Sequence, residues 1–279
     1  MINIGKYIEI VINWLTDNFS GFFDFLNSGI GGFIEGFQTI LFGIPFYITI
    51  ALIAVLAWFK SGKGMTLFVV LGLLLIYFMG YWKETMDTLA LVLSSTFIAL
   101  IIGIPLGIWA GNSDRAEKLL RPLLDFMQTM PAFVYLIPAV LFFGLGSVPG
   151  AFATVIFAMP PVVRLTSLGI RQVPQDIVEA TQSFGATKRQ LLVKVQLPLA
   201  LPTILTGVNQ TIMLSLSMVV IAAMIAAGGL GEIVLKGITQ MQIGLGFEGG
   251  IAVVILAIIL DRITQGMTKT NGKKKKDTE

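Results

Sequence analysis

The chain has 279 residues, of which 55% are hydrophobic and 13% are charged, and its mean hydropathy of +0.86 is too high for a soluble domain of this length. It contains no cysteine and no histidine, which excludes disulfides, thiol nucleophiles, zinc motifs and imidazole acid–base chemistry. The formal net charge of +3 comes largely from the lysines at 273–276, and a basic cytoplasmic tail explains it better than nucleic-acid binding.

Membrane-spanning helices are predicted wherever about 20 mostly apolar residues follow one another. Residues 1–37 come first and mix aromatic with acidic side chains, which predicts an amphipathic segment on the outer membrane interface. The fold class expected is all-α, a polytopic membrane protein with about seven transmembrane helices. These spans are predicted at residues 38–59, 65–81, 89–110, 132–145, 150–163, 201–227 and 247–260.

The basic residues in the connectors predict the orientation of the chain. With seven spans, the Lys and Arg residues within 60–63, 115–121, 164–194 and 269–276 all fall on one side of the membrane. The N-terminus is therefore expected outside the cell and the C-terminus in the cytoplasm. The expected organisation is an interfacial segment (1–37), two accessory transmembrane helices (38–84), a core domain (85–265) and a basic cytoplasmic tail (266–279).

A polar stretch, residues 164–200, separates the fifth and sixth predicted spans. Pro174 suits the first turn of a helix and Gly185 suits a left-handed cap after its last turn. Thr187 and Gln190 form a capping-box signature for a second helix, which Pro198 is expected to end. The sequence therefore predicts two short helices joined by a tight glycine turn.

Apolar residues at helical spacing predict an exposed apolar face on this pair of helices, formed by Ile177, Phe184 and Leu191. Such a face would fill a groove on another protein, and the surrounding basic residues would steer the docking. By periodicity alone, a hairpin that rests on the lipid interface explains the pattern equally well. The surrounding basic residues are Arg171, Lys188, Arg189 and Lys194.

The spacing within this stretch resembles the cytoplasmic "EAA" loop of ABC importer permeases, written EAA, three residues, G, nine residues, I-x-L-P. Thr181 stands where the family has alanine and Val195 where it has isoleucine, and both replacements are similar in size. The resemblance implies docking into a cytoplasmic ATPase subunit. It implies a role in ATPase coupling for Glu179, Ala180, Phe184, Gly185, Leu197 and Pro198.

The resemblance extends over about residues 85–265, the expected core permease domain. The segments GIPLGIWAG (103–111), QTMPAFVYLIPAVLFFGLG (128–146) and AAGGLGEIVLKGI (226–238) look like permease subunits of glycine betaine/proline osmoprotectant ABC importers of the binding-protein-dependent type I family. This family implies a multi-pass protein of the cell membrane that pairs with a second copy of itself. It also implies two cytoplasmic ABC ATPases and an extracellular substrate-binding protein, which is expected as a separate polypeptide because only a basic tail follows residue 260.

The chain itself is expected to be a non-catalytic subunit with no catalytic, cofactor or metal site. No GxxxxGK[ST] phosphate loop occurs in it, because the string SGKGMT at 61–66 lacks the first glycine. ATP and Mg are therefore expected on the partner ATPase. Membrane lipid is a further expected partner, and nucleic acid is not.

Polar residues in the sixth predicted span either line a pathway or form hydrogen bonds between helices, and the substrate path stays unassigned. These residues are Asn209, Gln210, Ser215 and Ser217. Glycines are expected to let helices approach closely at Gly103, Gly107 and Gly207, and those near Gly228 are the candidate gate hinge.

The leading interpretation is the transmembrane subunit of an ATP-driven importer for glycine betaine or a related compatible solute, with carnitine, choline and proline as alternative substrates. A secondary carrier or channel that is not driven by ATP is the alternative class. A membrane scaffold that recruits a cytoplasmic partner is a third. No Asp, Glu, Lys or Arg lies deep in a predicted span, which weighs against a proton-coupled carrier.

Overall fold

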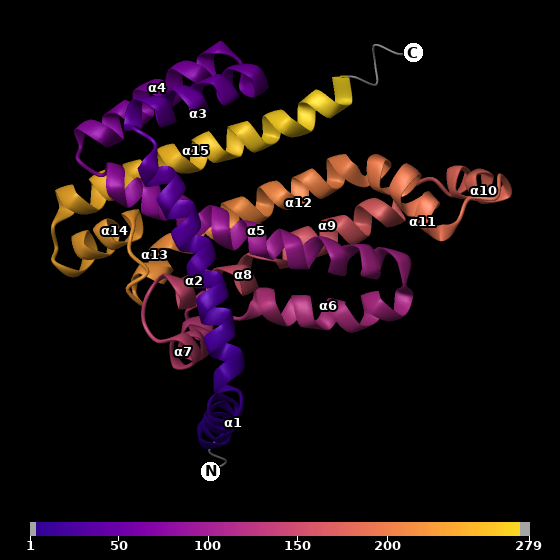
Figure 1. Ribbon diagram of the computed structural model, residues 1–279, viewed down its shortest axis with the longest axis horizontal. Coiled ribbons are helices and arrows are strands. Elements are labelled where there is room, and N and C mark those ends of the chain that lie inside the picture. Colours follow the sequence, from indigo (N-terminus) through magenta and orange to yellow (C-terminus); the bar gives the residue numbers. More distant parts are fainter. Residues whose placement is uncertain (1–3, 274–279) are drawn as a thin grey trace.

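The computed structural model describes residues 4–273, and this part of the chain is all helical. Helices α5, α6, α9, α12 and α15 run along the long direction of the molecule, whereas α2 crosses the bundle that they form (Figure 1). A π-helical segment, Leu192–Gln196, lies between α11 and α12. The α-helices are α1 (Ile4–Asn18), α2 (Ser20–Gly43), α3 (Phe46–Ser61), α4 (Lys63–Phe78), α5 (Trp82–Asn112), α6 (Asp114–Thr129), α7 (Ala132–Phe143), α8 (Ser147–Ala158), α9 (Pro160–Arg171), α10 (Gln175–Ser183), α11 (Lys188–Leu191), α12 (Leu197–Ser217), α13 (Val219–Ala223), α14 (Leu230–Thr239) and α15 (Ile243–Lys273).

Four helical runs within the described residues are long and apolar enough to cross a membrane: α5, α8 with α9, α11 through α13, and α15. Two bent helix pairs, α2 with α3 and α6 with α7, raise the number to six if each pair is one span. The remaining predicted span, 65–81, corresponds to the apolar helix α4, whose 16 residues are fewer than the roughly 20 that a bilayer requires. The expected tail, 266–279, begins inside α15, and its residues 274–279 lie outside the described part.

The prediction of one continuous span over residues 38–59 is wrong. The chain turns by 102° between α2 and α3. Ile44 is extended, with φ −95° and ψ 125°, because the ring of Pro45 disfavours a helical conformation in the residue before it. Met130 is extended before Pro131 for the same reason, and α6 and α7 meet there at 99°.

The predicted N-terminal amphipathic segment corresponds to α1 and most of α2, and α2 lies across α5 and α8 (Figure 1). Ile34 is 1% exposed and packs in one cluster with Leu91 and Ala151. Phe33 stacks on Phe97 of α5, with 5.4 Å between the ring centroids. One face of α2 is therefore part of the packed interior.

Three glycines spaced by four residues bring the backbone of α5 against α9. A Cβ atom built at Gly107 would lie 2.5 Å from the Cβ atom of Thr166 and 2.7 Å from the backbone oxygen of Val163. A Cβ atom at Gly103 would lie 2.6 Å from Val162, and one at Gly111 would be crowded in the same way by α9. No side chain fits between the two helices at these positions.

The opposite side of α9 is also packed closely against α12. A Cβ atom at Gly207 would lie 3.0 Å from the Cα atom of Val162, and one at Gly169 would lie 3.1 Å from the Cβ atom of Ala200. The close approach expected at Gly207 and on α5 is thus confirmed. Helix α9 is held on both sides, so α5, α9 and α12 form one tightly packed unit.

The glycines near Gly228, expected as a gate hinge, are mostly locked in place. The Thr88 hydroxyl accepts a hydrogen bond of 2.8 Å from the backbone nitrogen of Leu230, and a Cβ atom at Gly229 would lie 2.5 Å from that hydroxyl. A Cβ atom at Gly231 would lie 2.3 Å from the backbone oxygen of Val219. Of these three glycines, Gly228 has open space around it, with φ +78°, which narrows the candidate hinge to this residue.

Replacing Gly107 with alanine is expected to lower the stability of the bundle, because the new methyl group meets the backbone of α9. Overpacking of this kind costs about 1–3 kcal/mol, more than the roughly 1 kcal/mol that alanine gains in helix preference. Gly250→Ala is the matched control, since open space surrounds that glycine inside α15. Thermal unfolding of the two detergent-solubilised variants compares them, and equal unfolding midpoints would contradict the close-packing account.

Candidate functional site

Helices α10 and α11 project beyond one end of the bundle (Figure 1). We call residues 174–191 the hairpin. Pro174 precedes the first residue of α10 with φ −54° and ψ 133°, and most side chains between it and Gln190 are exposed. The predicted pair of short helices is therefore confirmed, and it stands away from the rest of the chain.

The turn of the hairpin is a Schellman motif built on Gly185. The backbone nitrogen of Gly185 donates to the oxygen of Gln182 at 2.9 Å, and that of Ala186 donates to the oxygen of Thr181 at 3.3 Å. Gly185 has φ +80°, a conformation that costs a residue with a side chain about 1–2 kcal/mol. The predicted glycine cap is confirmed, and it fixes the direction in which the chain leaves α10.

The second helix begins with the predicted capping box. The backbone nitrogen of Thr187 donates to Oε1 of Gln190 at 2.8 Å, and the backbone nitrogen of Gln190 donates to Oγ1 of Thr187 at 3.3 Å. A cap of this kind stabilises a helix by about 1 kcal/mol. The hairpin thus holds its shape through local hydrogen bonds, although little of its surface is buried.

The predicted apolar face is smaller than expected. Phe184 is 93% exposed at the tip of the hairpin and Ile177 is 38% exposed, but Leu191 is only 6% exposed. Leu191 is buried because α11 leads directly into the bundle, so its side chain points into the protein. Glu179 and Ala180 are exposed beside the tip, and Oε1 of Glu179 accepts a hydrogen bond of 3.0 Å from Gln175.

Pro198 does not end the second helix, contrary to expectation. The chain continues from α11 through the π-helical segment into α12, and together they form one helical run, Lys188–Ala223. The backbone nitrogen of Leu197 donates to the oxygen of Leu192, five residues back. Pro198 has no N–H to donate, and it lies in the first turn of α12, directly after this wider turn. The wider turn therefore lets the helical run continue past the proline. Leu197 itself packs on α9 and α12 in a cluster with Ile170.

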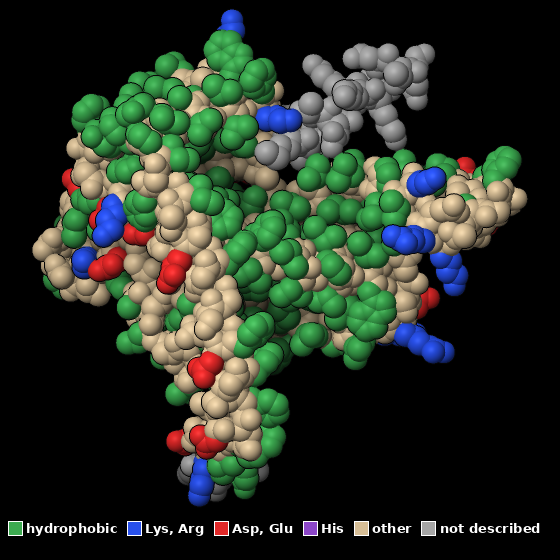
Figure 2. All heavy atoms as spheres, viewed as in Figure 1, with side chains coloured by type: hydrophobic (Ala, Val, Ile, Leu, Met, Phe, Trp, Pro, Cys, Tyr) green, Lys and Arg blue, Asp and Glu red, His purple; other side chains and the backbone are tan. Residues whose placement is uncertain are grey.

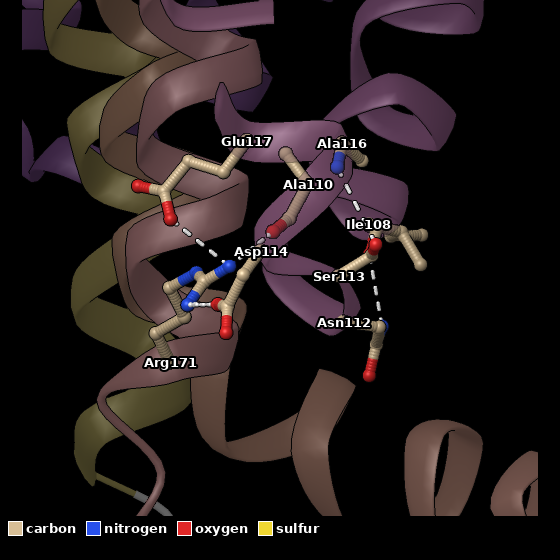
Figure 3. Close-up of polar contacts among 8 residues, drawn as sticks. All are labelled: Ile108, Ala110, Asn112, Ser113, Asp114, Ala116, Glu117 and Arg171. Carbon is tan, nitrogen blue, oxygen red and sulfur yellow. Dashed lines mark hydrogen bonds and ion pairs between the residues drawn. The ribbon is translucent and has the colours of Figure 1, made fainter. Parts of the chain in front are cut away.

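Arg171, the last residue of α9, ties the base of the hairpin to the elbow between α5 and α6. One guanidinium nitrogen lies 2.7 Å from Oδ1 of Asp114, and the other lies 2.9 Å from Oε2 of Glu117 and 2.8 Å from the backbone oxygen of Ala110 (Figure 3). The fixed, planar fork of an arginine suits three acceptors in such an arrangement. Sequence reasoning placed Arg171 among docking residues, and the structure instead places it in contacts within the chain.

A second ion pair joins the same helices further along. Nη2 of Arg164 lies 2.6 Å from Oδ1 of Asp125, which connects α9 to α6. A cleft of about 360 Å³ lies between the two ion pairs and is lined by both of them. These ion pairs thus join α6 to α9 beside an apolar cluster in which Leu120 and Leu124 of α6 pack with Val163 of α9.

Basic side chains gather at the end of the bundle that carries the hairpin, and hydrophobic side chains cover much of its flanks (Figure 2). Among the described residues, none of the basic side chains of the hairpin and of the π-helical segment is in an ion pair within the chain. The exposed basic residues at this end are Arg115, Lys118, Arg121, Lys188, Arg189 and Lys194. In the part of the chain described here, no group of three or more acidic residues could hold a metal ion.

The contacts of Arg171 are the functional feature that sequence reasoning missed. Asp114 follows an N-capping serine, and Glu117 lies one turn later, so the sequence alone could have predicted that both lie on the same face of α6. Their partner lies more than 50 residues further along the chain, and one sequence gives no signal for such a pairing. The six residues predicted for coupling do not form one cluster, since Leu197 and Pro198 lie at the base of α12 and the other four lie on the hairpin.

The chain matches the family described as the binding-protein-dependent transport system inner membrane component over residues 103–271. It is 52% identical over 266 residues to the glycine betaine transport system permease protein OpuAB of Bacillus subtilis (strain 168), covering 95% of this chain and 94% of that protein. It is also 52% identical over 267 residues to the glycine betaine/proline betaine transport system permease protein ProW of Escherichia coli (strain K12), covering 96% of this chain and 75% of ProW.

A third relative is the glycine betaine/carnitine transport permease protein GbuB of Listeria monocytogenes serotype 1/2a (strain 10403S). The two sequences are 51% identical over 272 residues, which cover 96% of this chain and 96% of GbuB. A solved structure of the MetNI methionine ABC transporter in an inward-facing conformation matches with a TM-score of 0.62 at 20% identity. That match covers 68% of this chain and 95% of the other, and it shows the fold. The chain is therefore an integral membrane protein with the fold of a type I ABC importer permease, and it belongs to the family of binding-protein-dependent transport system inner membrane components.

Proposed function

We propose that this chain is the transmembrane subunit of an ATP-driven importer for glycine betaine or a related compatible solute. The observation that carries the proposal is identity of about half over nearly the whole chain with permeases named for glycine betaine. Two of these relatives also name proline betaine or carnitine, so small quaternary ammonium zwitterions are the substrate class. The chain provides the path, and it contributes no catalytic group or cofactor site.

The hairpin is the docking element for a cytoplasmic ABC ATPase, which binds ATP and Mg. Phe184 supplies the apolar side chain that enters a groove on the ATPase, because it is almost fully exposed at the tip of a stiff turn. Glu179, Ala180 and Gly185 lie beside it or shape the turn, and Leu197 and Pro198 join the docking element to α12. The concentration of basic residues at this end supports a cytoplasmic position for the hairpin.

The working complex contains two copies of this chain, two ATPases and a separate extracellular binding protein. Dependence on a binding protein is part of the family description. A pathway that opens alternately to each side needs two halves that move against each other, and each half here is one copy of the chain. Membrane lipid surrounds the apolar flanks of the pair.

Force passes from the ATPase into the membrane through rigid contacts. When the two ATPases close on ATP, they draw the two hairpins together. Each hairpin is continuous with α12 and is joined to α9 at its other end, and α9 and α12 are in backbone contact. Arg171 carries part of the motion to α5 and α6 through its contacts with Ala110, Asp114 and Glu117.

The test of the proposed function is the ATP hydrolysis rate of the chain reconstituted in vesicles with its ATPase and binding protein. Glycine betaine, carnitine, choline and proline are compared as stimulating solutes, together with uptake of each. We expect one of the quaternary ammonium solutes to raise hydrolysis and to accumulate in an ATP-dependent manner. Uptake that proceeds without an ATPase would replace this function with that of a secondary carrier or channel.

Replacing Phe184 with alanine is expected to weaken ATPase binding by about 30-fold, as is typical for an aromatic anchor worth roughly 2 kcal/mol or more. Phe78→Ala is the matched control, because that side chain is 80% exposed at the end of α4 and takes no part in the hairpin. The amount of ATPase that stays bound to each variant on gel filtration gives the answer. Equal retention by the two variants would show that the tip is not the docking point.

Replacing Arg171 with glutamine is expected to leave the ATPase bound while solute uptake per ATP hydrolysed falls several-fold, because α6 no longer follows the hairpin. Arg115→Gln provides the control, since Arg115 is exposed on α6 and forms no ion pair with the described residues. Uptake and hydrolysis are measured in the same vesicles. A normal ratio in the Arg171 variant would rule out a coupling role for this contact.

A further inference from the structure

One face of α12 is left uncovered by the rest of the described chain. From residue 206 onward, its exposed residues recur at helical spacing and are polar or contain sulfur: Thr206, Gln210, Met213 and Ser217. We call these four residues the α12 stripe. The other faces of α12 pack against α5, α8, α9 and α15.

The polar residues of α12 divide into two groups with different surroundings. Asn209 donates to Oδ1 of Asp261 on α15 at 3.0 Å, and Thr96 on α5 donates to Ser215 at 3.2 Å. These two contacts hold helices together. Gln210 points away from the protein, and its amide has no hydrogen-bond partner among the described residues. The hydroxyls of Thr206 and Ser217 donate to backbone oxygens one turn earlier in α12, so Gln210 is the polar residue of the stripe whose exposure needs another explanation.

The depth of Gln210 makes its exposure informative. It lies 13 residues after Leu197 and 13 residues before Ala223, which places it midway along α12 and α13 taken together, about 20 Å from each end of that stretch. In the hydrocarbon core of a bilayer, an amide without hydrogen bonds is strongly disfavoured. By contrast, the exposed face of α15 carries apolar residues such as Ile251 and Val254, as expected of a surface that faces lipid.

We propose that the α12 stripe lines the water-filled path along which the solute crosses the membrane, facing the same stripe of the second copy. This inference rests on the proposed function and assigns residues to it. The amide of Gln210 donates hydrogen bonds to the solute carboxylate, and the soft thioether of Met213 contacts its methylated ammonium group. No residue of the stripe is charged, so neither end of a zwitterion is held too tightly to leave.

The absence of cysteine allows single thiols to be introduced at chosen positions. Gln210→Cys and Ser217→Cys report on the stripe. Val254→Cys and Ile251→Cys are the matched controls, because those residues are also exposed in the single chain but lie on the apolar face of α15. The probe is a membrane-impermeant methanethiosulfonate that carries a trimethylammonium group, applied to the assembled complex in vesicles with and without ATP and vanadate.

We expect the two stripe thiols to react at least about tenfold faster than the α15 thiols in one of the two nucleotide states, because a thiol in hydrocarbon stays protonated and unreactive. Modification of the stripe should also block solute uptake, whereas the α15 variants keep it. Reaction of every variant after unfolding in detergent confirms that each thiol is present and intact.

Stripe thiols that react as slowly as those of α15 in both nucleotide states would overturn the proposal and would indicate dry packing or lipid on this face. This result is distinguishable from a failure of the proposed function. If uptake is driven by ATP and the stripe thiols stay unreactive, the function stands and the stripe does not line the path. If the stripe thiols react and block uptake that needs no ATPase, the path assignment stands and the ATP-driven function fails.

Discussion

The backbone of α5 lies directly against α9, and α9 lies directly against α12, because glycines occupy the points of contact. A side chain at Gly107 would overlap the backbone of α9, and one at Gly207 would lie unusually close to it. Contacts of this kind leave little freedom for the helices to slide or rotate against each other. The arrangement of the hairpin, the elbow at Arg171 and the uncovered face of α12 all depend on this unit.

The hairpin is attached to this unit at both of its ends. Helix α9 leads into it through Arg171, and α11 leads out of it into α12 through the π-helical segment. Its own stiffness comes from the turn at Gly185 and the cap at Thr187, which are local hydrogen-bonded structures. An exposed element that is stiff and doubly attached transmits displacement, whereas a flexible loop would absorb it. The same attachment fixes the direction in which Gln210 faces on α12.

The sequence predicted the local features well, because each is encoded within a few residues. The left-handed cap at Gly185 and the pairing of Thr187 with Gln190 need only a short window of chain. The bend at Pro45 could also have been predicted, since a proline disfavours a helical conformation in the preceding residue. The apolar composition of residues 38–59 led instead to the prediction of one continuous span. At Pro198 the opposite error occurred: a helix end was predicted there, but a widened turn lets the helix continue past this proline.

The features that could not be predicted involve residues far apart in the chain. The pairing of Arg171 with Asp114, the burial of Leu191 and the difference between Asn209 and Gln210 appear only when the helices are assembled. Fold class and family were nevertheless readable, because composition, the glycine positions and the motif around Glu179 are properties of the sequence itself. Which of two neighbouring polar residues faces a pathway depends on how the helices pack, so it cannot be predicted from the sequence of one helix.

The most direct test of this account is the distance between spin labels at Lys188 on α11 and Ile101 on α5, measured by double electron–electron resonance. Complexes that contain one doubly labelled and one unlabelled copy give the distance within a single chain, and a sample labelled at Lys188 in both copies gives the distance between hairpins. On trapping with ATP and vanadate, the distance between hairpins should change while the distance within the chain stays the same. A change in the distance within the chain would contradict the rigid unit of α5, α9, α12 and the hairpin.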